Sequence, residues 1–201
     1  DLLPPSVDYS SFSSDSFIVL MKNNPIEYTF NEKIDSLEFT IESSIVESIE
    51  FDSVRSDSAI QIILKPPFAS YDSITINFSY LEDHVGLSTV DIAYVYKTPI
   101  LGDFDLDGAI TYYDMWALVE NWEANNTNYE LGPFTGVVPN LIPIPDSKFD
   151  IEDGVAFIKM WSWYQNSFGE ILVDTSQIGN GINIIQHRNI FNLVIDDSIV
   201  A

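Results

Sequence analysis

The sequence contains no cysteine, and it is poor in basic side chains and in histidine. The absence of cysteine excludes a disulfide framework, a thiolate nucleophile and Cys-ligated zinc or iron–sulfur sites. Only 8 Lys and Arg stand against 31 Asp and Glu, so the net charge is −23. Nucleic-acid binders and proteins that dock on anionic lipid carry a basic face. The charge balance therefore predicts that nucleic acid is not a partner of this chain.

Long apolar runs are also missing, because no stretch approaches the ~18 apolar residues of a membrane span. We therefore expect no membrane insertion. Glycine (9) and proline (10) are scarce in the 201 residues, which excludes collagen-like and low-complexity chains. The hydrophobic content of 46% is sufficient for a packed core. The first residue is Asp1 rather than Met, so we expect a processed form or a piece of a longer protein.

The first part of the chain, residues 1–98, consists of short segments in which apolar and polar residues alternate. This pattern, rich in β-branched and aromatic residues, is typical of strands. Polar clusters at 23–25 and 65–67 separate the segments, and no helical pattern intervenes. We therefore predict a sandwich of two antiparallel sheets. The expected strands cover residues 17–20, 26–30, 37–41, 60–64, 74–78 and 92–96.

The second part, residues 99–168, carries two segments with helical periodicity, at 112–122 and 153–164. The apolar face of each segment contains Met115, Leu118, Val119 and Trp122 in the first, and Phe157, Met160, Trp161 and Tyr164 in the second. Between them lies an irregular stretch, 123–148, with several prolines. A loop of this length usually has a function or is held in place by other parts of the domain.

The last part, residues 169–201, returns to a strand pattern at 171–173, 182–185 and 191–195, with a turn at 179–181. So few residues cannot form a sandwich alone. We interpret them as the start of a further β-domain. The alternative is that these strands pair with the first sandwich.

The most specific motif covers residues 103–114 and has the pattern of a twelve-residue EF-hand calcium loop. Asp103, Asp105 and Asp107 occupy positions 1, 3 and 5, and Gly108 occupies position 6, where the chain turns sharply. Ile110 is the expected apolar plug of the loop. The predicted metal ligands are Asp103, Asp105, Asp107, the backbone carbonyl of Ala109, Thr111 and Asp114. The alternative is a solvated acidic turn.

The spacing of these residues suits calcium for a physical reason. Calcium takes six to eight hard oxygen ligands, and alternate residues of a tight loop can all point inward. A carboxylate on the first helical turn adds a ligand near the positive end of the helix dipole. Four carboxylates this close together repel one another, and one cation relieves the repulsion. We therefore predict Ca2+ as the bound ion.

A partner site is expected before the second helix, because the sequence partly repeats. Aligning Trp122 with Trp161 places Asp114 over Asp153 and Asp107 over Asp146. The predicted ligands of a second calcium ion are Asp146, the carbonyl of Lys148, Asp150 and Asp153. The first half of the loop is not repeated, because Ile142 and Ile144 stand in its aspartate positions. The missing ligands must come from the long loop, through backbone carbonyls or Glu130; the alternative is that the aspartates only cap the helix.

A calcium loop that leads directly into a helix and recurs once after a connector resembles the dockerin modules of bacterial secreted proteins. The resemblance covers residues 101–168 and rests on GDFDLDG at 102–108 and FDIEDG at 149–154. The connector, with ELGP at 130–133, is longer than in cellulosomal dockerins and looks like a variant in large secreted proteins of Bacteroidota-related bacteria. The resemblance implies paired calcium loop–helix units and, as one kind of partner, a cohesin-like domain.

A weaker resemblance covers residues 8–98. The phrases YTFNEKID at 28–35, DSITI at 72–76 and LEDHVG at 81–86 look like those of bacterial Ig-like domains in surface-layer proteins and adhesins. In those domains a strand ending in Phe-x-Glu-x-Ile/Met-Asp precedes a Leu-x-Asp-x-x-Gly turn. The resemblance implies an Ig-like β-sandwich and a location outside the cell, at a bacterial cell surface.

Nothing in the sequence indicates an enzyme. The only histidines are His84 and His187, both predicted at the surface, and there is no Gly-x-Ser-x-Gly elbow or phosphate-binding glycine loop. Paired carboxylates can catalyse glycoside hydrolysis, but the close sets here are better used by calcium. We therefore assign no catalytic residue and no cofactor other than calcium.

The predicted fold is mainly β with a small α module. An Ig-like β-sandwich (1–98) is followed by a dockerin-like pair of calcium loop–helix units (99–168) and the first strands of a further β-domain (169–201). The predicted function is that of a non-catalytic, calcium-stabilised structural module in a larger extracellular cell-surface, adhesive or filament-forming protein. The expected partners are neighbouring domains or subunits of a surface assembly.

Two other functions stay open. The first is a recognition module for a cohesin-like receptor, which requires exposed surfaces on both helices centred on Tyr112, Tyr113, Ile151 and Glu152. The second is an accessory carbohydrate-binding module of a secreted enzyme, with an exposed platform formed by Trp116, Trp161 or Trp163. The alternative is that these tryptophans belong to the core.

Overall fold

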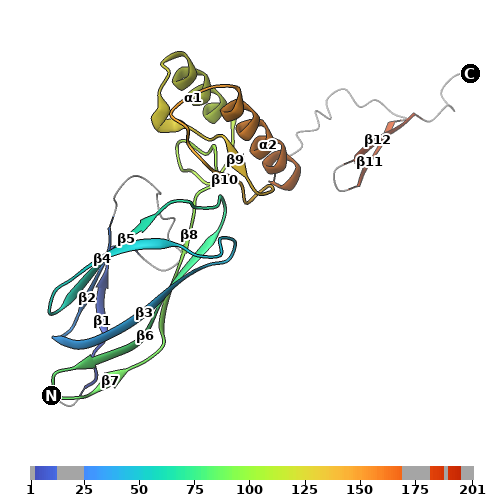
Figure 1. Ribbon diagram of the computed structural model, residues 1–201. Helices are drawn as coiled ribbons and strands as arrows, with labels where there is room; N and C mark the ends of the chain where they lie inside the picture. Colours follow the sequence, from blue (N-terminus) through green and yellow to red (C-terminus); the bar gives the residue numbers. More distant parts are fainter. Residues whose placement is uncertain (1–2, 13–24, 169–181, 188–189, 196–201) are drawn as a thin grey trace, which may run out of the picture.

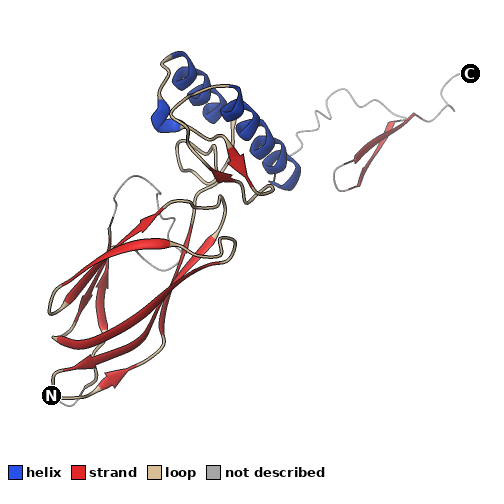
Figure 2. Ribbon diagram, viewed as in Figure 1, coloured by secondary structure: helices blue, strands red, loops and turns tan. Residues whose placement is uncertain are grey.

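The structure is a computed structural model that describes residues 3–12, 25–168, 182–187 and 190–195. The strands expected at 17–20 and 171–173 lie outside the described residues. The fold is mainly β with two α-helices, as predicted (Figures 1 and 2).

The N-terminal unit contains two antiparallel sheets. The first sheet has the order β1-β2-β5-β4. In the second sheet β6 pairs with β3 along one edge and with β7 and β8 along the other. The bounds are β1 Val7–Ser10, β2 Ile26–Phe30, β3 Ile34–Ser43, β4 Glu50–Arg55, β5 Ala59–Lys65, β6 Ser73–Asp83, β7 Ser88–Thr89 and β8 Ile92–Lys97.

Alternation along the strands places one apolar face of each sheet against the other. In β2 the side chains of Ile26, Tyr28 and Phe30 are buried while the residues between them are half-buried. Phe78 of β6 meets Tyr28 edge-on, with ring centroids 4.9 Å apart, and meets Phe30 at 6.1 Å. The two sheets therefore form a sandwich with a single aromatic and aliphatic core.

Five of the expected strands lie within β2, β3, β5, β6 and β8. The short strands β1 and β7 and the longer strand β4 were not expected, and for β4 the residues explain why. All six side chains of β4 are exposed, so this edge strand has no buried face and no alternation to detect. It forms because its backbone pairs with β5 from Glu50 to Arg55.

The second unit contains both helices and has its own apolar core. The predicted helix at 112–122 is α1, and the predicted helix at 153–164 extends in both directions to become α2. Figure 1 shows β9 and β10, which belong to the long connector, between the helices and the sandwich. The bounds are α1 Tyr112–Glu123, the 3-10 helix η1 Thr127–Tyr129, β9 Phe134–Thr135, β10 Ile142–Pro143 and α2 Ile151–Phe168.

Most residues of the apolar face predicted for the first helix do not lie in the core, so this prediction is wrong for them. Of that face only Leu118 is buried, whereas Met115, Val119 and Trp122 are exposed. The reason is that the buried stripe of α1 runs through Asp114 and Leu118, one turn apart on the same face. The second helix does pack as expected through Phe157 and Met160, with Trp161 and Tyr164 partly buried against the same core.

The strands expected at 182–185 and 191–195 correspond to β11, Ile182–His187, and β12, Ile190–Ile195. They pair antiparallel with each other as a separate two-stranded sheet. Within the described part of the chain they form no ladder with the sandwich, so the alternative pairing with the first sandwich is not seen. No helix among the described residues is long and apolar enough to cross a membrane.

Candidate metal centre

The first loop, residues 103–114, folds tightly around the side chain of Asp103. Its carboxylate accepts hydrogen bonds from the amide of Asp107 at 3.2 Å and from the amide of Gly108 at 2.9 Å. Gly108 has a φ of 87° with open space around it, so the backbone conformation rather than crowding favours glycine. The resulting turn matches the sharp bend expected at position 6 of a calcium loop.

Three of the predicted ligands come together. One carboxylate oxygen from each of Asp103, Asp105 and Asp114 lies within 4.8 Å of the others. Among the described residues this is the only such group of three or more potential metal ligands. Asp103 is 6% exposed and Asp114 is 1% exposed, whereas Asp105 faces solvent.

The electrostatics of this group favour a bound cation. Burial, followed by the negative charges of Asp114 and Asp107, raises the pKa of the Asp103 carboxyl to about 6. The salt bridges found in the described part of the chain involve Asp57, Asp52 and Asp146, and none reaches this group. Buried carboxylates without a basic partner are costly, and a hard cation with oxygen ligands offsets that cost.

The remaining residues of the first loop surround this group without joining it. The Asp107 carboxylate turns toward the second half of the loop and accepts the amide of Ala109 at 2.8 Å. Thr111 is the N-cap of α1, and its hydroxyl accepts the amide of Tyr113 at 3.2 Å. The predicted roles of Asp107, Ala109 and Thr111 as metal ligands stay predictions.

Asp114 ties the two ends of the loop to the start of the helix. Its Oδ1 accepts the amide of Phe104 at 2.8 Å, and its Oδ2 accepts the amide of Thr111 at 2.7 Å. With Thr111 it forms a capping box, which satisfies amides that the helix leaves free. Asp114 therefore organises the loop whether or not a metal ion binds there.

The second repeat reproduces this arrangement at the helix. Asp153, fully buried, accepts the amide of Leu131 at 2.7 Å through Oδ1 and the amide of Asp150 at 2.6 Å through Oδ2. Asp150 in turn accepts the amide of Glu152 at 3.0 Å, as Thr111 does for Tyr113. Asp153 therefore corresponds to Asp114, as the sequence alignment predicts.

The same correspondence identifies Glu130 as the residue in the first position of the second loop. Leu131 takes the place of Phe104, so the preceding residue, Glu130, takes the place of Asp103. The Glu130 carboxylate accepts the amide of Ser147 at 3.1 Å, just as Asp103 accepts the amide of Gly108. Ser147 also has a left-handed φ of 68°. Residues 132–145 are thus an insertion where the first loop has only two residues.

The second loop differs from the first in its charges. The Lys148 ammonium pairs with Asp146 at 2.7 Å and holds the pKa of that carboxyl below its usual range. Glu130 keeps one oxygen, Oε1, buried and without a hydrogen-bond partner. The structure thus brings Asp150, Asp153 and Glu130 to equivalent loop positions, but they do not form a close group like that of the first loop. The second calcium site and its ligands Asp146, Lys148, Asp150 and Asp153 stay predictions.

Two residues near the end of α2 lie near the first loop and were not identified from the sequence. Gln165 donates from Nε2 to the carbonyl of Ile110 at 3.1 Å. Burial, followed by the charges of Asp107 and Asp103, raises the pKa of Tyr164. Contacts of this kind join residues more than fifty positions apart, so no local pattern indicates them.

Comparisons with known proteins add little to this geometry. No protein-family model and no curated protein matches the sequence. Among solved structures, the chain is similar to the crystal structure of the N-terminal part of the bacterial S-layer protein SbsC, with 16% sequence identity and a TM-score of 0.34. The similarity covers 48% of this chain and 24% of that one.

The raised pKa of Asp103 predicts a pH dependence. In the calcium-free protein its stabilising effect is complete below the unfolded pKa of 3.8 and is lost as the pH rises through about 6. We expect the melting temperature in chelator to fall over this window more steeply than in an Asp103→Asn variant. Protons compete with calcium, so the increase in melting temperature caused by calcium should grow over the same window. Parallel slopes for the two proteins would contradict this assignment.

Proposed function

We propose that this chain is a non-catalytic, calcium-stabilised structural module of a larger extracellular protein. In this proposal the sandwich is Ig-like and the helical unit is dockerin-like. The observation that carries it is the group of Asp103, Asp105 and Asp114. Two of them are buried, and none of the basic side chains that the structure describes is paired to them. Asp107, Thr111 and the Ala109 carbonyl complete the proposed ligand set. Calcium would neutralise the loop and fix the start of α1.

The proposed location is the extracellular space at a bacterial cell surface. Calcium loops span dissociation constants from about 10⁻⁷ M to about 10⁻³ M, and the calcium outside cells, at ~1 mM, fills a site of ~10 µM almost completely. The net charge of −23 suits a module that stays soluble among many copies and is partly neutralised by cations. The proposed partners are neighbouring domains or subunits of a surface assembly.

Thermal unfolding with and without calcium tests this function. Calcium at ~1 mM over a site of ~10 µM dissociation constant stabilises the folded state by roughly 2.7 kcal/mol. For a module of about 70 residues this corresponds to an increase in melting temperature on the order of 10 °C. Magnesium at the same concentration is the control, because it requires near-octahedral geometry and dehydrates reluctantly. Equal melting temperatures in calcium and in chelator would contradict the proposal.

The second calcium site can be tested through Glu130. We propose that Glu130 supplies the ligand that Asp103 supplies in the first loop, because both accept the amide at the turn. Glu130→Gln removes the charge and keeps the size, so it is expected to abolish binding of the second ion and leave the first. Calorimetric titration measures both. Glu47→Gln, at an exposed position on the sandwich, is the matched control. Unchanged stoichiometry in Glu130→Gln would show that Glu130 is not a ligand.

A second candidate function is recognition of a protein partner, and the exposed face of the helices favours it. Tyr112 and Trp116 are 57% and 61% exposed, and Ile151 and Ile158 are exposed on α2. Exposed apolar side chains of this kind can contact a protein partner. A hollow of about 470 Å³ lies along α1, and its lining includes Phe104, Tyr113 and Tyr129.

Binding to immobilised cohesin-type domains tests this candidate. Binding that is lost in a Tyr112→Ser/Ile151→Ser variant, with the melting temperature unchanged, would favour recognition over a purely structural role. The exposure of Trp116 also keeps the carbohydrate-binding alternative in view, and a panel of soluble polysaccharides in the same assay tests it. Absence of binding in both assays leaves the structural module as the proposal.

A further inference from the structure

Among the described residues, hydrogen bonds and a ring contact join the sandwich to the helical unit at a small region, which we call the joint. It consists of residues 70–71 in the loop between β5 and β6, residues 99–101, residues 140–141 in the connector, and Trp163 of α2. Ser70 and Leu141 are both buried. Three segments that are distant in sequence therefore converge on two residues of one sandwich loop.

The contacts at the joint are specific. The Ser70 amide donates to the Leu141 carbonyl at 2.8 Å, and the Ser70 hydroxyl accepts the amide of Leu101 at 2.9 Å. The Asn140 side chain donates to the Ser70 carbonyl at 3.0 Å and to the Tyr71 carbonyl at 3.1 Å. The insertion in the second loop therefore has a structural role, because its tip reaches the sandwich.

The calcium loop is attached to the joint from both sides. On one side, Asp103 follows Leu101 by two residues and its amide bonds to the Ile100 carbonyl at 3.0 Å. On the other side, Gln165 of α2 holds the Ile110 carbonyl. Two residues before Gln165, the ring of Trp163 packs on Tyr71, with centroids 5.4 Å apart. The last turns of α2 therefore connect the loop to the sandwich.

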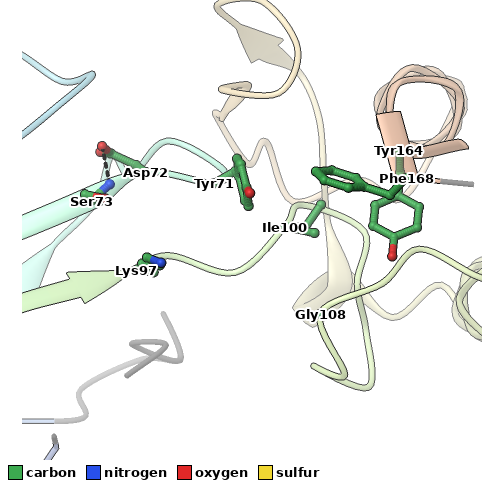
Figure 3. A pocket seen from close by; sticks show the side chains of 8 residues that line it. All are labelled: Tyr71, Asp72, Ser73, Lys97, Ile100, Gly108, Tyr164 and Phe168. Atoms are coloured by element: carbon green, nitrogen blue, oxygen red, sulfur yellow. Dashed lines mark hydrogen bonds between the residues drawn. The ribbon is translucent and has the colours of Figure 1, made fainter. Parts of the chain in front are cut away.

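A hollow lies beside the joint, between the sandwich and the helical unit. It has a volume of about 440 Å³ and is lined on the sandwich side by Tyr71 and Lys97 and on the helical side by Gly108, Tyr164 and Phe168. Figure 3 shows Tyr71 facing the hollow from one side and the rings of Tyr164 and Phe168 from the other, with Ile100 between them. A joint that is filled on one side and open on the other has room to bend.

We propose that the first calcium loop controls the rigidity of this joint, so that the two units move as one body with calcium bound and articulate without it. The proposal rests on the proposed function, because it requires calcium in the loop. It goes further by naming what the ion regulates. Contacts from Asp103 through Ile100 and from Ile110 through Gln165 and Trp163 both lead to residues 70–71. An ordered loop therefore holds these contacts in place and fixes the angle between the two units.

The absence of cysteine allows a direct test with spin labels on the full chain. Cysteines introduced by Thr40→Cys on β3 and Glu123→Cys on α1, both at exposed positions, report the distance between the units. Pulsed electron–electron double resonance is expected to give one narrow peak in the distance distribution in calcium. In chelator we expect that peak to be lost. Calorimetry on the same labelled protein reports whether calcium binds.

A second variant distinguishes loss of the joint from unfolding of the helical unit. Tyr71→Ala combined with Asn140→Ala removes joint contacts without touching any proposed ligand. It is expected to bind calcium with unchanged affinity and still lose the narrow peak. The matched control is Tyr9→Ala, an exposed tyrosine on β1, which should keep the peak.

Each outcome decides between the two claims. Calcium binding together with a narrow peak in both calcium and chelator would overturn the control of the joint and leave the proposed function standing. A narrow peak in the calcium-bound Tyr71→Ala/Asn140→Ala variant would overturn the route through residues 70–71. Absence of calcium binding would overturn the proposed function and this inference together.

Discussion

Asp103→Asn is expected to abolish calcium binding at the first loop and to remove the calcium-dependent part of the stability. Asp103 is buried and is the proposed ligand at position 1, and its carboxylate also accepts two loop amides. Asparagine keeps the size and one accepting oxygen but removes the charge. The expected loss is the linkage free energy of the site, ~2.7 kcal/mol under the conditions given above. Calorimetric titration and thermal unfolding in calcium measure it.

In chelator the same substitution should have the opposite effect. Without calcium, the charged Asp103 is buried near Asp114 and Asp107, and removing its charge relieves that repulsion at neutral pH. Asp91→Asn, at an exposed left-handed position on the sandwich, is the control and should change neither measurement. A variant that binds calcium as well as the parent chain would show that the loop is a solvated turn.

Asp153→Ala is expected to destabilise the helical unit strongly, whether or not calcium is present. Asp153 is completely buried and accepts the amides of Leu131, Gly132 and Asp150. Alanine leaves three amides without a partner, at about 1–3 kcal/mol for each buried group. The amide of Asp150 is one of the three, so the capping contact at the start of α2 is lost with them. We expect a loss of at least ~3 kcal/mol in chemical denaturation.

This prediction separates the structural role of Asp153 from its predicted role as a ligand. Asp153→Asn keeps one accepting oxygen and should lose less stability than Asp153→Ala. Glu152→Ala, at the exposed neighbouring position, is the control and should stay close to the parent protein. If Asp153→Ala were as stable as Glu152→Ala, the equivalence of the two loops at Asp114 and Asp153 would be wrong.

The parts of the molecule that were predictable from sequence are those that depend on local pattern. Most strands of the sandwich alternate with period two. The first loop is contiguous in sequence, so the residues that come together at 103, 105 and 114 could be counted from Asp103. The start of α1 at Tyr112 follows from Thr111 and Asp114, a capping box. These signals lie within a few residues of one another.

The features that sequence did not reveal depend on contacts between distant segments. Glu130 was one of two options for the second loop. Its equivalence to Asp103 depends on the bonds from Leu131 to Asp153 and from Ser147 to Glu130, which join distant residues. The connector packs on the sandwich through Asn140 and Leu141, seventy residues from their partner Ser70. Helical periodicity alone did not show which side of α1 faces the core, because the buried stripe contains a carboxylate, Asp114.

Calorimetric titration of the chelator-stripped protein with calcium, on the parent chain and on Asp103→Asn, decides whether this chain is a calcium-stabilised module. We expect saturable binding of two ions to the parent chain and loss of the first-loop ion in the variant. A titration with no saturable heat, together with a melting temperature that calcium does not change, would contradict it.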